Sequence, residues 1–294
     1  MATRSEDVLH GDAGPLFRAS YRPPGEVWGR LLLVHGYGDH CGRHSEFLEY
    51  AADQGVLAQG IDLRGQGRSS GLRGHVERWE QYVDDLAVAA NADAPSGCPA
   101  APFFLLGHSH GALVVVAAVL SERASPTHCI LTAPYFAARH QVPGYKVALG
   151  RCVEPLFPAM RLPSGLPDHW MSRDPERLRD SRRDPLLVRT ATPRWYFRSL
   201  EAQAQLRESA PNWRLPLLAL IGSDDPVADP AAAREYCRNV PGPDVTFEEL
   251  PGMLHEILRE VDRRRVFELI LGWMRARATG EDATAVSRAS SSAG

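Results

Sequence analysis

The segment with the clearest potential for chemistry is residues 107–111, with the sequence GHSHG. Residues 103–106 before it have the apolar character of a buried strand, and residues 112–116 after it have that of a helix. At such a turn a serine is held out above the sheet, and the flanking glycines remove Cβ atoms that would collide. The helix N-terminus also favours negative charge beside the serine. The segment therefore predicts a nucleophile at Ser109, with an ordinary glycine-rich loop as the alternative.

A serine nucleophile near neutral pH needs a base, and a histidine oriented by a carboxylate is well suited to that role. His255 follows the last predicted strand, while Asp224, Asp225 and Asp229 follow the strand before it. The carboxyl ends of parallel strands meet at one edge of a sheet, so a histidine there can reach Ser109. The order Ser, Asp, His along the chain fits this layout. The residues alone do not separate Asp224 from Asp225.

The loop after the first buried strand, residues 35–40 with the sequence HGYGDH, predicts part of an oxyanion hole. Small, flexible residues at the end of a strand leave backbone N–H groups free to face a ligand. In a serine hydrolase of this layout, this loop supplies one donor and the residue after the nucleophile supplies the other. We therefore expect the backbone N–H groups of Tyr37 and His110 to bind the oxyanion. A plain strand-to-helix turn is the alternative.

Composition narrows the chemistry further. The chain has 294 residues, of which 44% are hydrophobic, and a formal charge of −3, which argues against a nucleic-acid partner. Lys146 is the only lysine, so no Gly-Lys-Ser/Thr phosphate loop exists, and the glycines of residues 62–69 fit no nucleotide fingerprint. The five cysteines are widely spaced, without a CxxC pair or an HExxH helix, so we expect no metal and no cofactor. Reduced thiols, together with the lack of a signal peptide or bilayer-length apolar run, predict a cytoplasmic protein.

Strand and helix patterns alternate along the chain, which predicts a mostly parallel sheet with helices on both faces. Residues 16–21 and 30–34 predict an edge hairpin that leads into the buried strand. Between residues 135 and 213 prolines recur and short apolar clusters lie among dense charges. This stretch is too long for a connecting loop, so we predict an inserted helical cap on a core formed by residues 1–134 and 214–278. The tail, residues 279–294, is expected to be disordered.

Taken together, these segments make the chain resemble α/β hydrolases of the monoacylglycerol lipase and lysophospholipase type, from about residue 16 to residue 277. The resemblance rests on VHGYGDH at 34–40, DLRGQGRSSGLRGHV at 62–76, GHSHG at 107–111, SRDP at 172–175, DPL at 184–186, GSDDPVADP at 222–230 and PGMLHE at 251–256. It implies an α/β-hydrolase fold with an inserted cap, and it places the catalytic acid on Asp225 and the catalytic histidine on His255. The implied reaction is hydrolysis of carboxylic esters of single-chain lipids, with a mobile cap over the acyl-chain pocket.

One position departs from this family pattern, because the residue after the nucleophile is often Met and here is His110. Only its backbone N–H is needed, so the oxyanion hole is retained, while the side chain could alter pocket polarity and pH response. The apolar clusters of the cap are expected to bind an acyl chain, or to contact a membrane or micelle surface transiently. Packing of these clusters on the core is the alternative.

Two other functions remain open from the sequence. A hydrolase of the same layout could act on amides, lactones or peptide N-termini, and Glu154, Asp168 or Asp174 would then be candidates to bind a free amine. A non-catalytic ligand-binding protein on a hydrolase scaffold is the second alternative. The usual mark of such a protein is loss of a triad residue, and all three candidates are present here.

Overall fold

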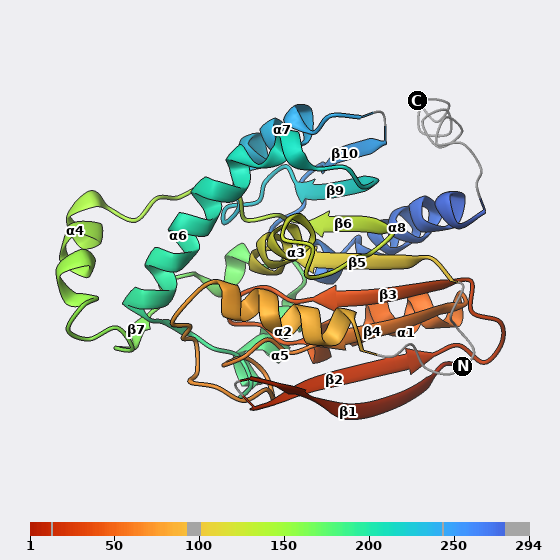
Figure 1. Ribbon diagram of the computed structural model, residues 1–294, viewed down its shortest axis with the longest axis horizontal. Coiled ribbons are helices and arrows are strands. Elements are labelled where there is room, and N and C mark those ends of the chain that lie inside the picture. The colour runs from red at the N-terminus through yellow and green to blue at the C-terminus, as the bar shows by residue number, and fades with distance from the viewer. Residues whose placement is uncertain (13, 93–100, 243, 280–294) are drawn as a thin grey trace.

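The computed structural model describes residues 1–12, 14–92, 101–242 and 244–279. Their main feature is a sheet with the strand order β1-β2-β4-β3-β5-β6-β9-β10 (Figure 1). The strands are β1 (Thr3–Gly11), β2 (Gly14–Arg22), β3 (Gly29–Val34), β4 (Val56–Ile61), β5 (Phe103–His108), β6 (His128–Thr132), β9 (Leu217–Gly222) and β10 (Val245–Leu250). In this order, neighbouring strands from β4 to β10 are parallel, whereas the pairs β1–β2 and β2–β4 are antiparallel.

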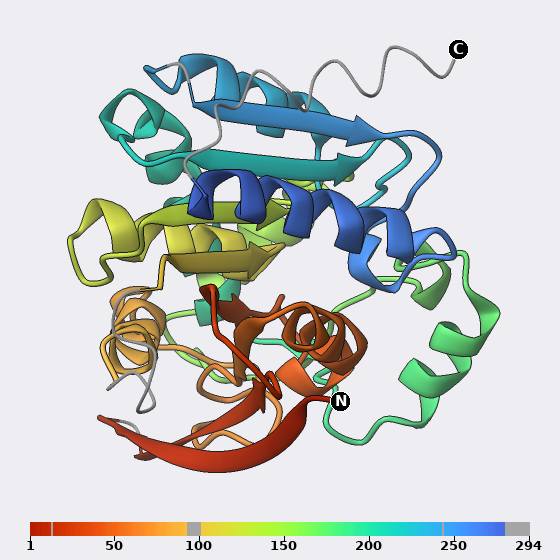
Figure 2. The ribbon, with the colours of Figure 1, turned by 90° about the vertical axis from the view of Figure 1, so that its right-hand side faces the viewer.

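Helices cover both faces of this sheet. The helices α1 (Ser45–Asp53) and α8 (Arg263–Ala278) pack on one face, and Figure 2 shows α8 lying across it. The helices α2 (Glu80–Ala90), α3 (His110–Leu120) and α7 (Pro230–Asn239) pack on the other. The predicted parallel sheet with helices on both faces is therefore confirmed.

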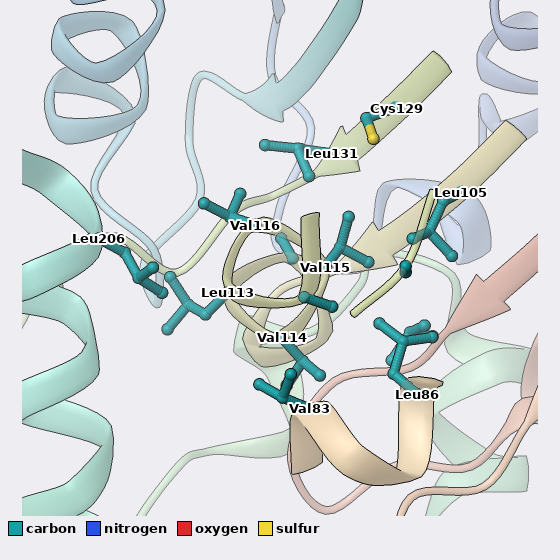
Figure 3. Packing of buried hydrophobic residues seen from close by; sticks show 14 of the residues in the cluster. Val83, Leu86, Leu105, Leu113, Val114, Val115, Val116, Cys129, Leu131 and Leu206 are labelled. Carbon is teal, nitrogen blue, oxygen red and sulfur yellow. The ribbon is translucent and has the colours of Figure 1, made fainter. Parts of the chain in front are cut away.

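The core follows from the two-residue period of the strands. Leu105 of β5 and Leu131 of β6 face α3, where they lie beside Val115 (Figure 3). The adjacent Phe104 and Leu106 point the other way, into the core under α1 and α8. Each such side chain contributes about 1.5–3 kcal/mol when fully buried. Because α3 is apolar almost all round and buried between neighbours, it is a rigid support for the residue that precedes it.

The predicted edge hairpin is wrong in its pairing. β2 does not pair with β3; it pairs with β1, from Thr3 opposite Arg22 onward, and with β4 on its other side. β1 was missed because its sequence is polar and its residues are largely exposed, so the alternation that marks a half-buried strand is absent. β3 instead lies between β4 and β5, in the centre of the sheet.

Residues 133–216 connect β6 to β9, and the first part of this stretch lies beyond the ends toward which the parallel strands point (Figure 1). They contain α4 (Gly144–Val153), β7 (Leu162–Pro163), α5 (Pro175–Arg183), β8 (Thr190–Ala191) and α6 (Pro193–Glu208). Local sequence explains two helix starts, because Asp174 and Thr192 accept N-cap hydrogen bonds and each is followed by a proline. α4 differs from the other α-helices of the described chain in having no buried residue.

Three other expectations can be compared with the described residues. Of the five cysteines, Cys41, Cys129, Cys152 and Cys237 are free thiols, and Cys98 lies outside the described residues. Of the predicted tail, Thr279 ends α8, and residues 280–294 lie outside the described residues. No helix in the described chain combines the length and apolar character needed to cross a bilayer.

Candidate active site

Ser109 lies at a tight turn between β5 and α3, with φ +54° and ψ −116°. A non-glycine residue at positive φ is uncommon, and here close packing on both sides holds it. A Cβ on Gly107 would lie 2.6 Å from the Cα of Ala112, and a Cβ on Gly111 would lie 2.4 Å from the carbonyl oxygen of Val34. The two glycines therefore allow helix, strand and neighbouring strand to approach closely enough to force the turn.

The structure brings the three predicted triad side chains together. His255 Nε2 lies 2.9 Å from Ser109 Oγ, and His255 Nδ1 lies 2.8 Å from Asp225 Oδ2. Their relative exposures are 7% for Ser109, 5% for His255 and 0% for Asp225. The residues come from the ends of β5 and β9 and from the loop after β10, at the shared carboxyl edge of the sheet.

Backbone geometry separates the three candidate aspartates. The second carboxylate oxygen of Asp225 accepts hydrogen bonds from the N–H groups of Val227 and Ala228, at 2.7 and 3.0 Å. These bonds turn the carboxylate inward, toward the histidine. Asp224 is exposed and accepts a bond from the adjacent Ser223 hydroxyl, and Asp229 caps α7. Asp225 is thus the aspartate of the three that contacts His255.

Burial and the neighbouring carboxylate act on His255 in opposite directions. Burial lowers its pKa, but the charge and hydrogen bond of Asp225, together with the charges of Glu256 and Asp39, outweigh burial, and the net pKa is raised. The Asp225 carboxylate accepts a hydrogen bond from the Nδ1–H group, which leaves Nε2 as the lone-pair acceptor facing the Ser109 hydroxyl. The histidine is therefore oriented to take a proton from the serine.

The other nearby histidines have different partners. His108 packs against His255 with ring centroids 5.2 Å apart, and burial holds its pKa well below the usual value, so it stays neutral. His35 Nε2 accepts the N–H of Leu63 at 3.0 Å, and His40 Nε2 lies 2.8 Å from a carboxylate oxygen of Asp184. These contacts hold the loop of residues 35–40 against Leu63 of the core and Asp184 of the stretch between β6 and β9.

The predicted oxyanion donors both border the cavity that contains Ser109 and His255. A Cβ on Gly36 would lie 3.2 Å from the Ser109 Cβ, so the loop passes directly beside the nucleophile. The Tyr37 hydroxyl lies 2.8 Å from the carbonyl oxygen of Gly74 and its ring stacks on Trp195 at 3.5 Å. Within the described residues, no hydrogen bond uses the backbone N–H of Tyr37 or His110. Both N–H groups are thus available to a ligand, that of Tyr37 on an anchored loop and that of His110 at the start of α3.

The side chain of His110 is enclosed by aromatic rings. The centroids of Trp79 and Tyr82 lie 4.9 and 5.0 Å from its ring, and those of Tyr37 and Trp195 lie 5.9 and 5.8 Å away. Neither ring nitrogen has a hydrogen-bond partner in the described chain, and burial lowers its pKa to about 3. His110 is therefore neutral near neutral pH and acts as a packing residue, as the methionine common at this position would.

Two adjoining cavities lie above the triad. The first, of about 140 Å³, contains Ser109 and His255, and the second, of about 410 Å³, shares Tyr37, Tyr135 and Trp195 with it. Most of the second cavity's wall is apolar, including Phe136, Ala137, Ala138, Val142, Val147, Ala191 and Leu200.

Several of these lining residues were not singled out from the sequence. Tyr135, Trp195 and Leu200 come from separate parts of the chain, and no local pattern distinguishes them from core residues. Of the apolar clusters predicted to bind a chain, Val147 lines the second cavity, whereas Leu156 and most of the others are exposed on the outside. In the part of the chain that the structure describes, no group of three or more His, Cys, Asp or Glu side chains is arranged to hold a metal ion.

Comparisons with known proteins show which family the chain resembles. The family model described as "Hydrolase_4: Serine aminopeptidase, S33" matches residues 25–262. The chain is 28% identical over 275 residues to a monoacylglycerol lipase of Mycolicibacterium smegmatis, covering 93% of this chain and 98% of that protein. It is 27% identical to an uncharacterized abhydrolase domain-containing protein of Dictyostelium discoideum over 94% of this chain, but spans only 29% of that protein. The crystal structure of a Paleococcus ferrophilus monoacylglycerol lipase superposes with a TM-score of 0.79 at 25% identity, covering 88% of this chain and 98% of that one.

Proposed function

Because the chain belongs to the S33 serine aminopeptidase family of α/β hydrolases, we propose that it hydrolyses carboxylic esters of single-chain lipids, with Ser109 as its nucleophile. The observation that carries this proposal is the hydrogen-bonded series Ser109, His255 and Asp225 at the base of two adjoining cavities. The M. smegmatis relative and the P. ferrophilus structure, both monoacylglycerol lipases, support a lipid ester as the substrate.

The proposed reaction has two acyl-transfer steps. Ser109 Oγ attacks the ester carbonyl carbon while His255 Nε2 takes the hydroxyl proton, and the carbonyl oxygen becomes an oxyanion held by the N–H groups of Tyr37 and His110. His255 then returns that proton to the leaving alcohol as the C–O bond breaks, which leaves an acyl-Ser109. Water attacks the acyl-enzyme in the same way and releases the fatty acid. Asp225 stabilises the imidazolium in both steps.

The second cavity is the proposed site for the acyl chain. It adjoins the nucleophile through Tyr37, Tyr135 and Trp195, and its wall is mostly apolar. Each buried CH₂ of a substrate contributes roughly 0.8 kcal/mol to binding. A chain long enough to enter this cavity should therefore bind more tightly than a short one that stays beside Ser109.

The amine of a peptide N-terminus finds little free negative charge in this site, although the family model carries the name of an aminopeptidase. Recognition of a free amine requires an unpaired carboxylate near the nucleophile. The acidic candidates instead pair with arginine: Glu154 with Arg194, Asp168 with Arg182 and Arg189, Asp174 with Arg263, and Asp39 and Glu256 with Arg43. This pairing favours an uncharged ester over an aminoacyl substrate.

We also propose that residues 135–213 act as a cap on the core formed by residues 1–134 and 214–278. Both cavities support this division, because each has walls from the core and from the insertion. Trp195 and Leu166 come from the insertion, and Tyr37 comes from the core. Opening of the insertion would then admit a lipid to the cavities.

The outer face of this cap is the proposed surface for transient contact with a membrane or micelle. Large apolar side chains that are exposed there are Tyr145, Leu149, Leu156, Phe157, Met160 and Leu162. Lys146, Arg151 and Arg161 are exposed among them, and none forms an ion pair with a described carboxylate. Apolar groups rimmed by unpaired positive charge fit an anionic lipid surface. We keep the cytoplasm as the proposed compartment, on the basis of the free thiols.

The decisive experiment compares the parent protein with Ser109→Ala on a substrate panel. The panel contains monoacylglycerols of increasing chain length, a lysophospholipid, a short soluble ester and an aminoacyl amide. For the parent protein we expect fatty acid release from the lipid esters, a higher kcat/KM for longer chains and covalent labelling by a fluorophosphonate. We expect Ser109→Ala to lose both turnover and labelling. Turnover by Ser109→Ala at the parent rate would overturn the nucleophile, and cleavage of the amide alone would overturn the substrate class.

A further inference from the structure

The catalytic histidine lies in the irregular segment between β10 and α8, so regular structure does not fix its backbone. Glu260 is the buried acidic residue nearest to it in sequence after Glu256, with 0% exposure. Its carboxylate takes no part in the proposed reaction. A buried carboxylate must be well hydrogen-bonded to be tolerated, so its partners show what it organises.

Those partners come from two different segments. Oε1 accepts the backbone N–H of Leu254 at 3.1 Å, and Leu254 directly precedes His255. The same oxygen accepts the backbone N–H of Arg173 at 3.2 Å, and the Arg173 Nε lies 3.2 Å from both carboxylate oxygens. Oε2 also accepts the N–H of Val261 at 2.9 Å. One carboxylate thus ties the histidine segment to Arg173, which belongs to the insertion.

Further bonds run beside this one. The N–H of Glu256 donates to the carbonyl oxygen of Met171 at 2.7 Å, and the N–H of His255 lies 3.5 Å from the carbonyl oxygen of Trp170. The Ser172 hydroxyl donates to the carbonyl oxygen of Arg259 at 2.9 Å. Residues 170–173 therefore lie along the histidine segment and contact it at several points.

We propose that Glu260 is a positioning residue for His255, and that it couples the seating of residues 170–173 of the insertion to the activity of the triad. This inference rests on the proposed function of Ser109 and His255. Asp225 orients the imidazole ring, whereas Glu260 fixes the position of the backbone that carries this ring. A misplacement of about 1 Å in a reacting group can cost about 10²-fold in rate.

The test uses Glu260→Gln in the full chain, with active sites counted by titration with a fluorescent phosphonate. Glutamine keeps an acceptor but loses the charge and places an NH₂ group against N–H donors. We expect kcat per titrated site to fall about 10- to 100-fold, by the same factor for a short soluble ester and a long-chain ester, with KM nearly unchanged. Asp262→Asn is the matched control, because Asp262 contacts the same arginine at 3.3 Å but is exposed, and it should keep the parent rate per site.

Arg173→Met is the second variant, and it decides the case if Glu260→Gln does not fold. Its side chain is 42% exposed, and Arg173→Met removes the guanidinium bonds to Glu260 while leaving the backbone N–H bond of residue 173 in place, so it weakens the link on the side of the insertion alone. We expect a smaller fall in kcat per site, and a double variant whose loss is less than the product of the two single losses. Fewer titrated sites with an unchanged rate per site would show a merely structural role and overturn the inference. A parent protein that neither labels nor turns over esters would instead overturn the proposed function.

Discussion

Replacing Asp225 with asparagine should invert the proton arrangement of the triad. One oxygen of Asp225 accepts two backbone N–H groups, from Val227 and Ala228, at 2.7 and 3.0 Å. In Asp225→Asn the amide oxygen must stay at that position, because an NH₂ group there would face two donors. The NH₂ group then points at His255 Nδ1 and donates to it. The histidine is left with its proton on Nε2, facing the serine hydroxyl as a donor when it should be an acceptor.

The expected cost follows from that inversion. A histidine in the wrong tautomer cannot take the Ser109 proton, and we expect kcat to fall by about 10⁴-fold, equivalent to about 5 kcal/mol of transition-state stabilisation. The raised pKa of His255 should also fall in the variant, because burial remains while the opposing carboxylate is gone. The side-chain volume is nearly unchanged, so the fold should be retained.

The assay is the rate of acyl-enzyme formation with a chromogenic short ester, measured as a pre-steady-state burst, alongside the rate constant for fluorophosphonate labelling. Asp224→Asn is the matched control, since its carboxylate is exposed and bonded to the neighbouring Ser223 hydroxyl. We expect the control to stay within about twofold of the parent, as surface substitutions generally do. An Asp225→Asn rate within about tenfold of the parent, or an equal loss in Asp224→Asn, would refute the tautomer argument.

Three further predictions follow from the same contacts. Because the Asp225 carboxylate raises the pKa of His255 and activity needs the neutral ring, the acidic limb of the kcat/KM profile should lie above about pH 6.5. His110→Met should leave that limb in place, since the pKa of His110 is lowered to about 3. A shift of the limb in His110→Met would contradict the assignment of His110 as a packing residue. Gly111→Ala should lower the free energy of unfolding by about 3 kcal/mol or prevent folding, because the new Cβ would lie 2.4 Å from the carbonyl oxygens of Val34 and His35. A denaturation midpoint equal to that of the parent would show that the turn can relax. Phe157→Ser should reduce binding to anionic vesicles in a flotation assay without changing turnover of a soluble ester. Val261→Ser, at a comparably exposed position outside the insertion, should leave vesicle binding intact. Equal losses of vesicle binding in both variants would argue against the cap as the contact surface.

Much of the fold could be predicted from local pattern, because most of the parallel strands are short apolar runs and most of the core helices repeat apolar residues at helical spacing. The pairing of β2 could not, since β1 is polar and largely exposed, so its sequence lacks the alternation that marks a strand. The resemblance to α/β hydrolases of the monoacylglycerol lipase type is confirmed by the family match over residues 25–262 together with the similarity to monoacylglycerol lipases. The lining of the second cavity could not be predicted either, because its wall is assembled from residues about 170 positions apart, such as Tyr37 and Gln203.

The sequence by itself determined which residue types stand at the ends of which strands, and therefore that Ser109 and His255 would lie at one edge of the sheet. It did so because strand direction and the strained turn are encoded locally, in apolar runs and paired glycines. Only the tertiary structure decided between Asp224 and Asp225 on physical grounds, since backbone N–H groups turn one side chain inward and leave its neighbour in solvent. It also joined Glu260 to Arg173, a contact across 87 residues that no local pattern records.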